Sequence, residues 1–164
     1  MARRERRLTK RERKAVHASA TTLDDRVRAF AAESGIPDER IYLGGSDGRP
    51  KMSEVLTEWA APILDNQRGN LIEFKNAVKF ATVLWNMATM SRDPAEVVAN
   101  QLLEAALAAG VPYSADMHAI LVDLVASRRA VYGEDSRVVI DTEVLQGERE
   151  YRLEVAASYL SPPA

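Results

Sequence analysis

The sequence predicts a mostly α-helical (α+β) fold, a bundle of about five helices closed by a C-terminal antiparallel β-hairpin. Apolar residues recur every three to four positions in five segments between residues 22 and 132. Between residues 137 and 156 the apolar period changes to two, and a glycine interrupts it where a turn is needed. The 164 residues, 46% of them apolar, are enough for one domain with a packed core.

Charge divides the chain into a basic N-terminal arm, residues 1–20, and a single globular domain, residues 21–164. The first 14 residues have a net charge of +6, whereas the remainder has 14 basic and 22 acidic residues, a net charge of −8. Such asymmetry is typical of an interaction arm. A capping box at Thr9–Glu12 favours a short helix, but the arm has too few apolar residues to pack firmly. The basic residues expected to contact nucleic acid or a partner are Arg3, Arg4, Arg6, Arg7, Lys10, Arg11, Arg13 and Lys14.

The first helix of the domain is expected from Thr22 to Ser34, because Gly35 is placed to end it. Its apolar face comprises Leu23, Val27, Phe30 and Ala31. Residues 36–51 are rich in glycine and are expected to form a loop. A DNA-binding helix-turn-helix over residues 31–41 is a weaker interpretation than a loop, because its second helix would be short and would present acidic residues to phosphate.

The second helix, residues 53–64, should kink or break near Ala60, because Pro62 has no amide hydrogen and clashes with the preceding turn. The third begins at Asn70 and extends to residue 90. It is apolar around most of its circumference, which predicts a central position in the bundle. The Asp93-Pro94 pair starts a fourth helix that ends before residue 110, and a fifth follows from residue 116 to about 132.

The hairpin is expected to turn at Gly147-Glu148, with glycine first as a type II′ turn requires. This register places six side chains on one face by pairing Val144 with Tyr151, Thr142 with Leu153 and Ile140 with Val155. A two-stranded hairpin is marginal by itself, so it must pack on the helices.

Composition excludes several kinds of chemistry. The chain has no cysteine, which excludes disulfides and thiolate sites, and its two histidines are far apart in sequence. No cofactor motif or metal-ligand cluster is evident, so we expect neither a cofactor nor a metal. The chain has no apolar run of membrane-spanning length and no signal-peptide pattern, so we expect a cytoplasmic protein with no membrane contact.

Two groups of residues are candidate sites outside the arm. Arg128 lies in the middle of the apolar face of the last helix, where its head either reaches water or joins an ion cluster. That cluster would comprise Arg128, Arg129, Arg137 and either Asp135 or Asp141. Lys75, Lys79 and Asn86 share the one polar arc of the central helix, which is either a solvated face or a contact for an anion.

Several short fragments, taken in order, form a pattern. They are Lys51-Met52-Ser53-Glu54-Val55-Leu56 with Ala61-Pro62-Ile63-Leu64, then Leu84-Trp85-Asn86, then Arg128-Arg129, Glu134-Asp135-Ser136-Arg137-Val138-Val139 and Leu153-Glu154-Val155-Ala156. This pattern resembles a group of small uncharacterised bacterial proteins with K-x-S-E-V-L, P-x-L, W-N and D-x-R segments and a terminal hairpin. The resemblance spans about residues 51–158. It implies one ordered domain and no particular activity.

The sequence favours a non-enzymatic binding or accessory protein that acts through protein–protein contacts of the helical domain, with a protein partner or a second copy. The alternative is an association with RNA or DNA through the basic arm, although the arm lacks aromatic residues for base stacking. An enzyme built from scattered carboxylates and arginines is the weakest hypothesis, since no nucleophile with an evident base is present.

Overall fold

A computed structural model of the chain describes residues 22–43 and 48–160. Their order is α2 (Leu23–Ser34), a 3₁₀ turn (Asp38–Arg40), β1 (Ile41–Tyr42), α3 (Met52–Trp59), α4 (Ala61–Leu64), a second 3₁₀ turn (Asp65–Gln67), α5 (Leu71–Met90), α6 (Ala95–Ala108), α7 (Met117–Val131), β2 (Arg137–Gln146) and β3 (Tyr151–Tyr159). The basic arm predicted for residues 1–20, with all eight of its Lys and Arg residues, lies outside the described residues.

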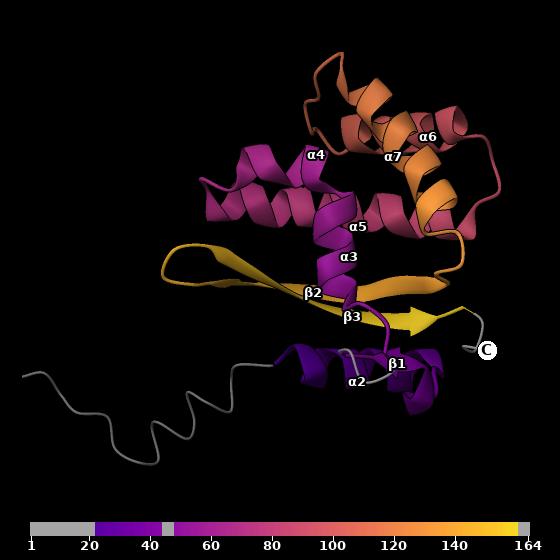
Figure 1. Cartoon of the computed structure of the whole chain (residues 1–164), viewed down its shortest axis with the longest axis vertical. Coiled ribbons are helices and arrows are strands. Elements are labelled where there is room, and N and C mark those ends of the chain that lie inside the picture. Colours follow the sequence, from indigo (N-terminus) through magenta and orange to yellow (C-terminus); the bar gives the residue numbers. More distant parts are fainter. Residues whose placement is uncertain (1–21, 44–47, 161–164) are drawn as a thin grey trace, which may run out of the picture.

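The elements form layers around a three-stranded sheet (Figure 1). Helix α2 covers one face of the sheet, and α3 and α5 cover the other. Helices α6 and α7 pack on each other and on α5 on the side away from the sheet. The predicted fold class, mostly α with a C-terminal hairpin, is confirmed.

Helix α2 begins and ends as its sequence predicts. The Thr22 hydroxyl accepts a hydrogen bond from the backbone N–H of Asp25, and the Asp25 carboxylate accepts one from the backbone N–H of Thr22. Gly35 ends the helix with a φ of 66°, a left-handed conformation that favours glycine. Phe30 was predicted on the buried face but is 48% exposed. Because one narrow sheet face is available, only the i, i+4, i+8 stripe of Leu23, Val27 and Ala31 is buried.

The segment after α2 contains a strand that the sequence analysis treated as loop. Ile41 pairs with Ser158 and Tyr42 with Ala157, so β1 adds to the free edge of β3 and the strand order is β1-β3-β2. A two-residue strand is too short to show an alternating pattern in sequence, which is why it was missed. The second helix required by the helix-turn-helix reading is absent from the described part of this segment.

The break predicted near Ala60 is confirmed. Helix α3 ends at Trp59 and α4 starts at Ala61, while Ala60 between them has φ −89° and ψ 10°. The proline at the second position of α4 therefore begins a new helix, as the missing amide hydrogen requires. The predicted second helix is two helices in the structure.

Helix α5 is the central helix, as predicted. The Asn70 side chain accepts hydrogen bonds from the backbone N–H groups of Ile72 and Glu73 and so fixes its first residue. The residues that α5 contributes to the core are Phe74, Ala77, Val78, Ala81, Leu84, Trp85 and Ala88. Helices α6 and α7 contribute Val98, Ala99, Leu102, Leu103, Ala106, Leu121, Leu124 and Val125.

The predicted register of the hairpin is wrong by two residues. Val144 pairs with Leu153 rather than Tyr151, and Thr142 pairs with Val155. The turn is a four-residue loop, residues 147–150, in which the Gly147 N–H donates to the Glu150 carbonyl at 2.9 Å. A slip of two residues leaves each of these side chains on its predicted face, so the apolar pattern alone cannot exclude it.

The predicted pairing of Ile140 with Val155 is wrong because β2 has a β-bulge at Ile140. The register shifts between Val139 and Asp141, so Ile140 has no partner in β3. Ile140 therefore packs with Leu23 and Val27 of α2 instead of pairing with Val155. Ile140 thus joins Ile41 and Ala156 in the apolar contact between the sheet and α2. No helix in the described part of the chain is long and apolar enough to cross a membrane.

Candidate functional site

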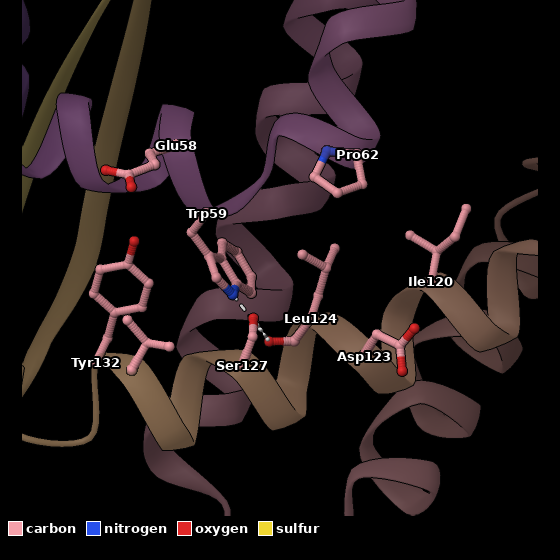
Figure 2. Close-up of a pocket in the computed structure, with 9 residues that line it drawn as sticks. Glu58, Trp59, Pro62, Ile120, Asp123, Leu124, Ser127 and Tyr132 are labelled. Carbon is pink, nitrogen blue, oxygen red and sulfur yellow. Dashed lines mark hydrogen bonds between the residues drawn. The ribbon is translucent and has the colours of Figure 1, made fainter.

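A groove about 470 Å³ in volume lies between the α3–α4 junction and α7 (Figure 2). We call it the α3–α7 groove. Its lining residues are Glu58, Trp59, Pro62, Ile120, Asp123, Leu124, Ser127, Val131 and Tyr132. The break that Pro62 imposes between α3 and α4 shapes one wall, and the outer face of α7 forms the other. Val131 is 70% exposed, so its side chain adds apolar surface to the groove.

A hydrogen bond fixes the floor of the groove. The Trp59 indole N–H donates to the Leu124 carbonyl at 2.9 Å, and the Ser127 hydroxyl donates to the same oxygen at 3.1 Å. The bond ties the end of α3 to the middle of α7, two segments 65 residues apart in sequence. Because the indole is buried, the bond also satisfies a donor that would be costly to leave unpaired.

The charged side chains of the groove are both acidic. Among the described residues, Glu58 and Asp123 line it and no lysine or arginine does. Figure 2 shows the Glu58 carboxylate and the Tyr132 hydroxyl pointing toward one another from α3 and from the end of α7. Burial raises the pKa of Tyr132, and the negative charge of Glu58 raises it further. The groove is therefore a negatively charged apolar surface.

Trp85 of α5 supports the groove from behind. Its side chain is fully buried, and its indole N–H donates to the Arg137 carbonyl at 2.8 Å. Its ring meets Trp59 edge-on at a centroid distance of 5.2 Å and Tyr132 at 5.7 Å. The Arg128 guanidinium lies over the same ring, with its central carbon 4.2 Å from the centroid. Two walls of the groove are thus packed on one rigid aromatic side chain.

The structure brings together Arg128, Arg129, Asp135 and Arg137, the predicted ion cluster. Arg128 is 2% exposed, so its head does not reach water as the simpler interpretation required. Its guanidinium donates to the Thr89 hydroxyl at 3.1 Å and to the backbone carbonyls of Tyr132 and Asp135. Arg128 is therefore held by carbonyl oxygens rather than by the Asp135 or Asp141 carboxylate.

The Asp135 carboxylate forms its ion pair with Arg137. Three hydrogen bonds of 2.6–3.1 Å join the two side chains, and Arg137 also donates to the Pro50 carbonyl at 2.9 Å. Burial by itself lowers the pKa of Arg137, but the bonds to Asp135 and its charge outweigh this effect, so the net pKa is raised. Asp141, the other predicted partner, instead pairs with Arg26 of α2 at 2.8 Å.

Arg129 joins α7 to the loop between α5 and α6. Its guanidinium donates to the Ser91 carbonyl at 3.0 Å and to the Asp93 carbonyl at 2.6 Å. Together with Arg128 it satisfies carbonyl groups at and beyond the ends of two helices, which have no partner within their own helix. The cluster therefore connects α5, α7 and the start of β2.

The predicted polar arc of α5 is divided between two environments. Lys75 and Lys79 are exposed at the outer face. The Asn86 side chain instead faces the sheet, where its amide donates to the Val139 carbonyl at 2.8 Å and accepts from the Val139 N–H at 2.7 Å. Asn86 is thus a bridge between α5 and β2, and the three residues do not form one site.

Sequence reasoning did not identify the groove residues as a site. Glu58, Trp59 and Tyr132 come from segments that sequence periodicity assigns to helix faces and ends. The available signal was the proline two residues after Ala60, since a helix break exposes side chains that a continuous helix would cover. The described residues contain no group of three or more His, Cys, Asp or Glu side chains able to hold a metal ion.

The chain matches no protein-family model, no curated protein and no solved structure in the comparisons with known proteins. Three of the short fragments noted in the sequence lie together in space. Trp85 contacts Arg128 and the Arg137 carbonyl, and the neighbouring Asn86 bonds to Val139. These contacts join α5, α7 and β2 at the centre of the fold.

Proposed function

We propose that this chain is a non-enzymatic binding protein that receives a segment of a partner protein in the α3–α7 groove. The observation that supports this proposal is the lining itself: an open apolar surface whose charged groups, Glu58 and Asp123, are both negative. Neither carboxylate takes part in an ion pair among the described residues. Such a surface is complementary to a cationic segment.

The partner segment that fits the groove combines an apolar side chain with a positively charged one. It presents an aliphatic or aromatic side chain to Pro62, Ile120 and Val131, and a lysine or arginine to Glu58 and Asp123. A volume of about 470 Å³ accommodates a few side chains rather than a folded surface. The Tyr132 ring offers the cation an aromatic face next to a carboxylate, an arrangement that favours positive charge.

The polar groups of the groove do not favour catalysis. The Ser127 hydroxyl donates to the Leu124 carbonyl, so it is not oriented toward a base that would activate it. The groove offers no nucleophilic side chain that Glu58 and Tyr132 could activate together, and His118 is not among its lining residues. Binding without chemistry is the function that fits these contacts.

The test uses the full chain and a series of synthetic 12-residue peptides, each with one lysine between apolar residues. Both tryptophans have indole N–H resonances in an NMR spectrum, and only Trp59 lines the groove. We expect such peptides to shift the Trp59 resonance in a saturable way and to leave the Trp85 resonance nearly in place.

Matched variants make this test specific. Replacing the peptide lysine by glutamine, or introducing Glu58→Gln into the protein, should weaken binding at least fivefold because one charge of the pair is lost. Glu104→Gln is the control, since Glu104 is exposed on α6 and is not part of the groove. Peptides that bind equally well with lysine or glutamate would contradict the proposal, as would a library in which no peptide moves Trp59.

A second candidate function rests on the net charge of +6 in residues 1–14. In this alternative the arm contacts RNA or DNA through phosphates, without reading sequence. The log of the affinity should then fall linearly with the log of salt concentration, with a slope of roughly −3 to −6 for a duplex. A filter-binding titration at two salt concentrations measures it, with a chain lacking residues 1–14 as control. No retention of nucleic acid at low salt would exclude this alternative.

A further inference from the structure

A second pocket, about 660 Å³ in volume, lies where the ends of α5 and α7 approach the segment before β2. We call it the arginine pocket. Three arginines line it, Arg92, Arg128 and Arg129, together with Thr89 and Ser91. The predicted ion cluster forms its inner wall. None of these residues lines the α3–α7 groove, so the two sites are separate.

The arginine pocket has more positive than negative charge. Asp135 is the one carboxylate among its described lining residues, and it already holds Arg137. The partners of Arg128 and Arg129 are carbonyl and hydroxyl oxygens, which carry no full charge. Burial lowers the pKa of Arg128, the charge of Asp135 opposes this effect, and the smaller effects of Arg129 and Arg137 add to the lowering. A bound anion would supply the full negative charge that the hydrogen-bond partners of Arg128 and Arg129 lack.

Two of the three guanidinium groups, those of Arg128 and Arg129, are held in place before any ligand arrives. Arg129 is fixed by the carbonyls of Ser91 and Asp93, and these two bonds use two of its five N–H groups. Arg92 is exposed and forms no ion pair among the described residues, so its guanidinium is available to a ligand. Because Arg129 is already held in place, only the exposed Arg92 side chain has to be ordered when an anion binds.

We propose that the arginine pocket binds the phosphate group of a small phosphorylated organic molecule. The planar guanidinium matches the spacing of phosphate oxygens and forms paired hydrogen bonds with them. The Ser91 hydroxyl, next to Arg92, is a further donor. The volume lies within the range of small-molecule sites, and Ala88 and Leu160 supply an apolar wall for the organic part of the ligand.

Calorimetric titration of the full chain at constant ionic strength tests this proposal. The probes are glycerol 3-phosphate and ribose 5-phosphate, with glycerol, ribose and inorganic phosphate as comparisons. We expect saturable binding of at least one phosphomonoester, at least fivefold tighter than inorganic phosphate, and no binding of the neutral compounds. Absence of binding by both phosphomonoesters at low ionic strength would overturn the proposal, and so would inorganic phosphate binding as tightly as they do.

Variants locate the binding. Arg92→Gln should weaken phosphomonoester binding at least tenfold without affecting the fold, because Arg92 is exposed and makes no ion pair in the described structure. Arg149→Gln is the matched control, since Arg149 is an exposed residue of the hairpin loop outside the pocket. Equal binding by wild type and Arg92→Gln would overturn the assignment. A DNA duplex that binds more tightly than the phosphomonoesters and requires Arg92 would overturn it in favour of a nucleic-acid site.

Discussion

Replacing Trp85 by alanine should destabilise the protein more than any other single substitution in α5. The Trp85 side chain is fully buried and contacts the rings of Trp59 and Tyr132 and the guanidinium of Arg128. Its indole N–H is bonded to the Arg137 carbonyl. One substitution therefore removes packing, two edge-on aromatic contacts, a cation–π contact and a hydrogen bond.

The magnitude follows from these contacts. Removing a large aromatic side chain from a packed core costs about 3–5 kcal/mol in the free energy of unfolding. The Arg137 carbonyl also loses its donor, a loss of roughly 1–3 kcal/mol if no water replaces the indole, which places Trp85 toward the upper end of this range. We expect a total near the upper end, about 4–5 kcal/mol. For a chain of this size that lowers Tm by roughly 8–20 °C.

Trp85→Phe separates the two contributions. Phenylalanine keeps most of the ring packing but has no N–H group to donate to Arg137. We expect about 2–3 kcal/mol for this variant, because it loses the hydrogen bond and part of the volume. The difference between the two variants estimates the packing contribution of the ring.

Urea unfolding followed by circular dichroism measures the stability of both variants. Trp59 remains in both and provides fluorescence as an independent probe. The slope of the unfolding free energy against urea should be unchanged, so the midpoint reports stability. A loss below about 1.5 kcal/mol for Trp85→Ala, with an unchanged slope, would refute the central role of Trp85 in the core. A cost for Trp85→Phe as large as that of Trp85→Ala would assign the whole effect to the hydrogen bond.

The remaining predictions concern three other contacts of the fold. Asn86→Ala leaves the N–H and carbonyl groups of Val139 without their partner and should cost roughly 2–4 kcal/mol by urea unfolding, whereas Lys79→Ala on the exposed face should change stability by less than about 0.5 kcal/mol. Asp135→Asn removes the charged partner of the buried Arg137 and should cost about 3–5 kcal/mol in the free energy of unfolding. Asp141→Asn should cost less than about 1 kcal/mol, because the side chains of Asp141 and its partner Arg26 are each about a third exposed. Similar costs for the two variants would contradict this ranking. Because the pKa of Tyr132 is raised in the folded state above its ordinary value of 10.0, its neutral form stabilises the protein fully below pH 10, and that stability is lost as the pH rises through the folded pKa. NMR titration of the Tyr132 ring should show this pKa falling in Glu58→Gln without returning to the ordinary value, because burial remains; an unchanged pKa would show that Glu58 does not act on the phenol.

The local features of the fold could be predicted because each depends on residues close in sequence. The Asn70 start of α5, the break caused by Pro62 and the glycine end of α2 all arise within one turn of backbone. The burial of α5 also followed from its composition, since an apolar circumference excludes contact with water on most sides.

The errors in the hairpin have a common cause. Apolar alternation determines which face a side chain occupies, but a shift of two residues or a bulge satisfies the same alternation locally. The bulge turns Ile140 toward Leu23 and Val27 of α2, a contact that strand alternation alone does not reveal. Similarly, β1 forms because β3 offers a free edge to Ile41 and Tyr42, and a two-residue segment has no sequence pattern that predicts a strand.

The sequence by itself predicted the helices, the change to a β-hairpin and the separation of charge, and it offered a cluster of Arg128, Arg129, Arg137 and either Asp135 or Asp141 as one of two interpretations of Arg128. Only the tertiary structure decided which oxygens those arginines bind, and that Glu58, Asp123 and Tyr132 line one groove while Arg92 and Arg129 line another pocket. Helix formation follows from short-range periodicity and capping. The groove and the pocket are formed by side chains from segments far apart in sequence, and packing at native density, rather than any local pattern, brings those segments together.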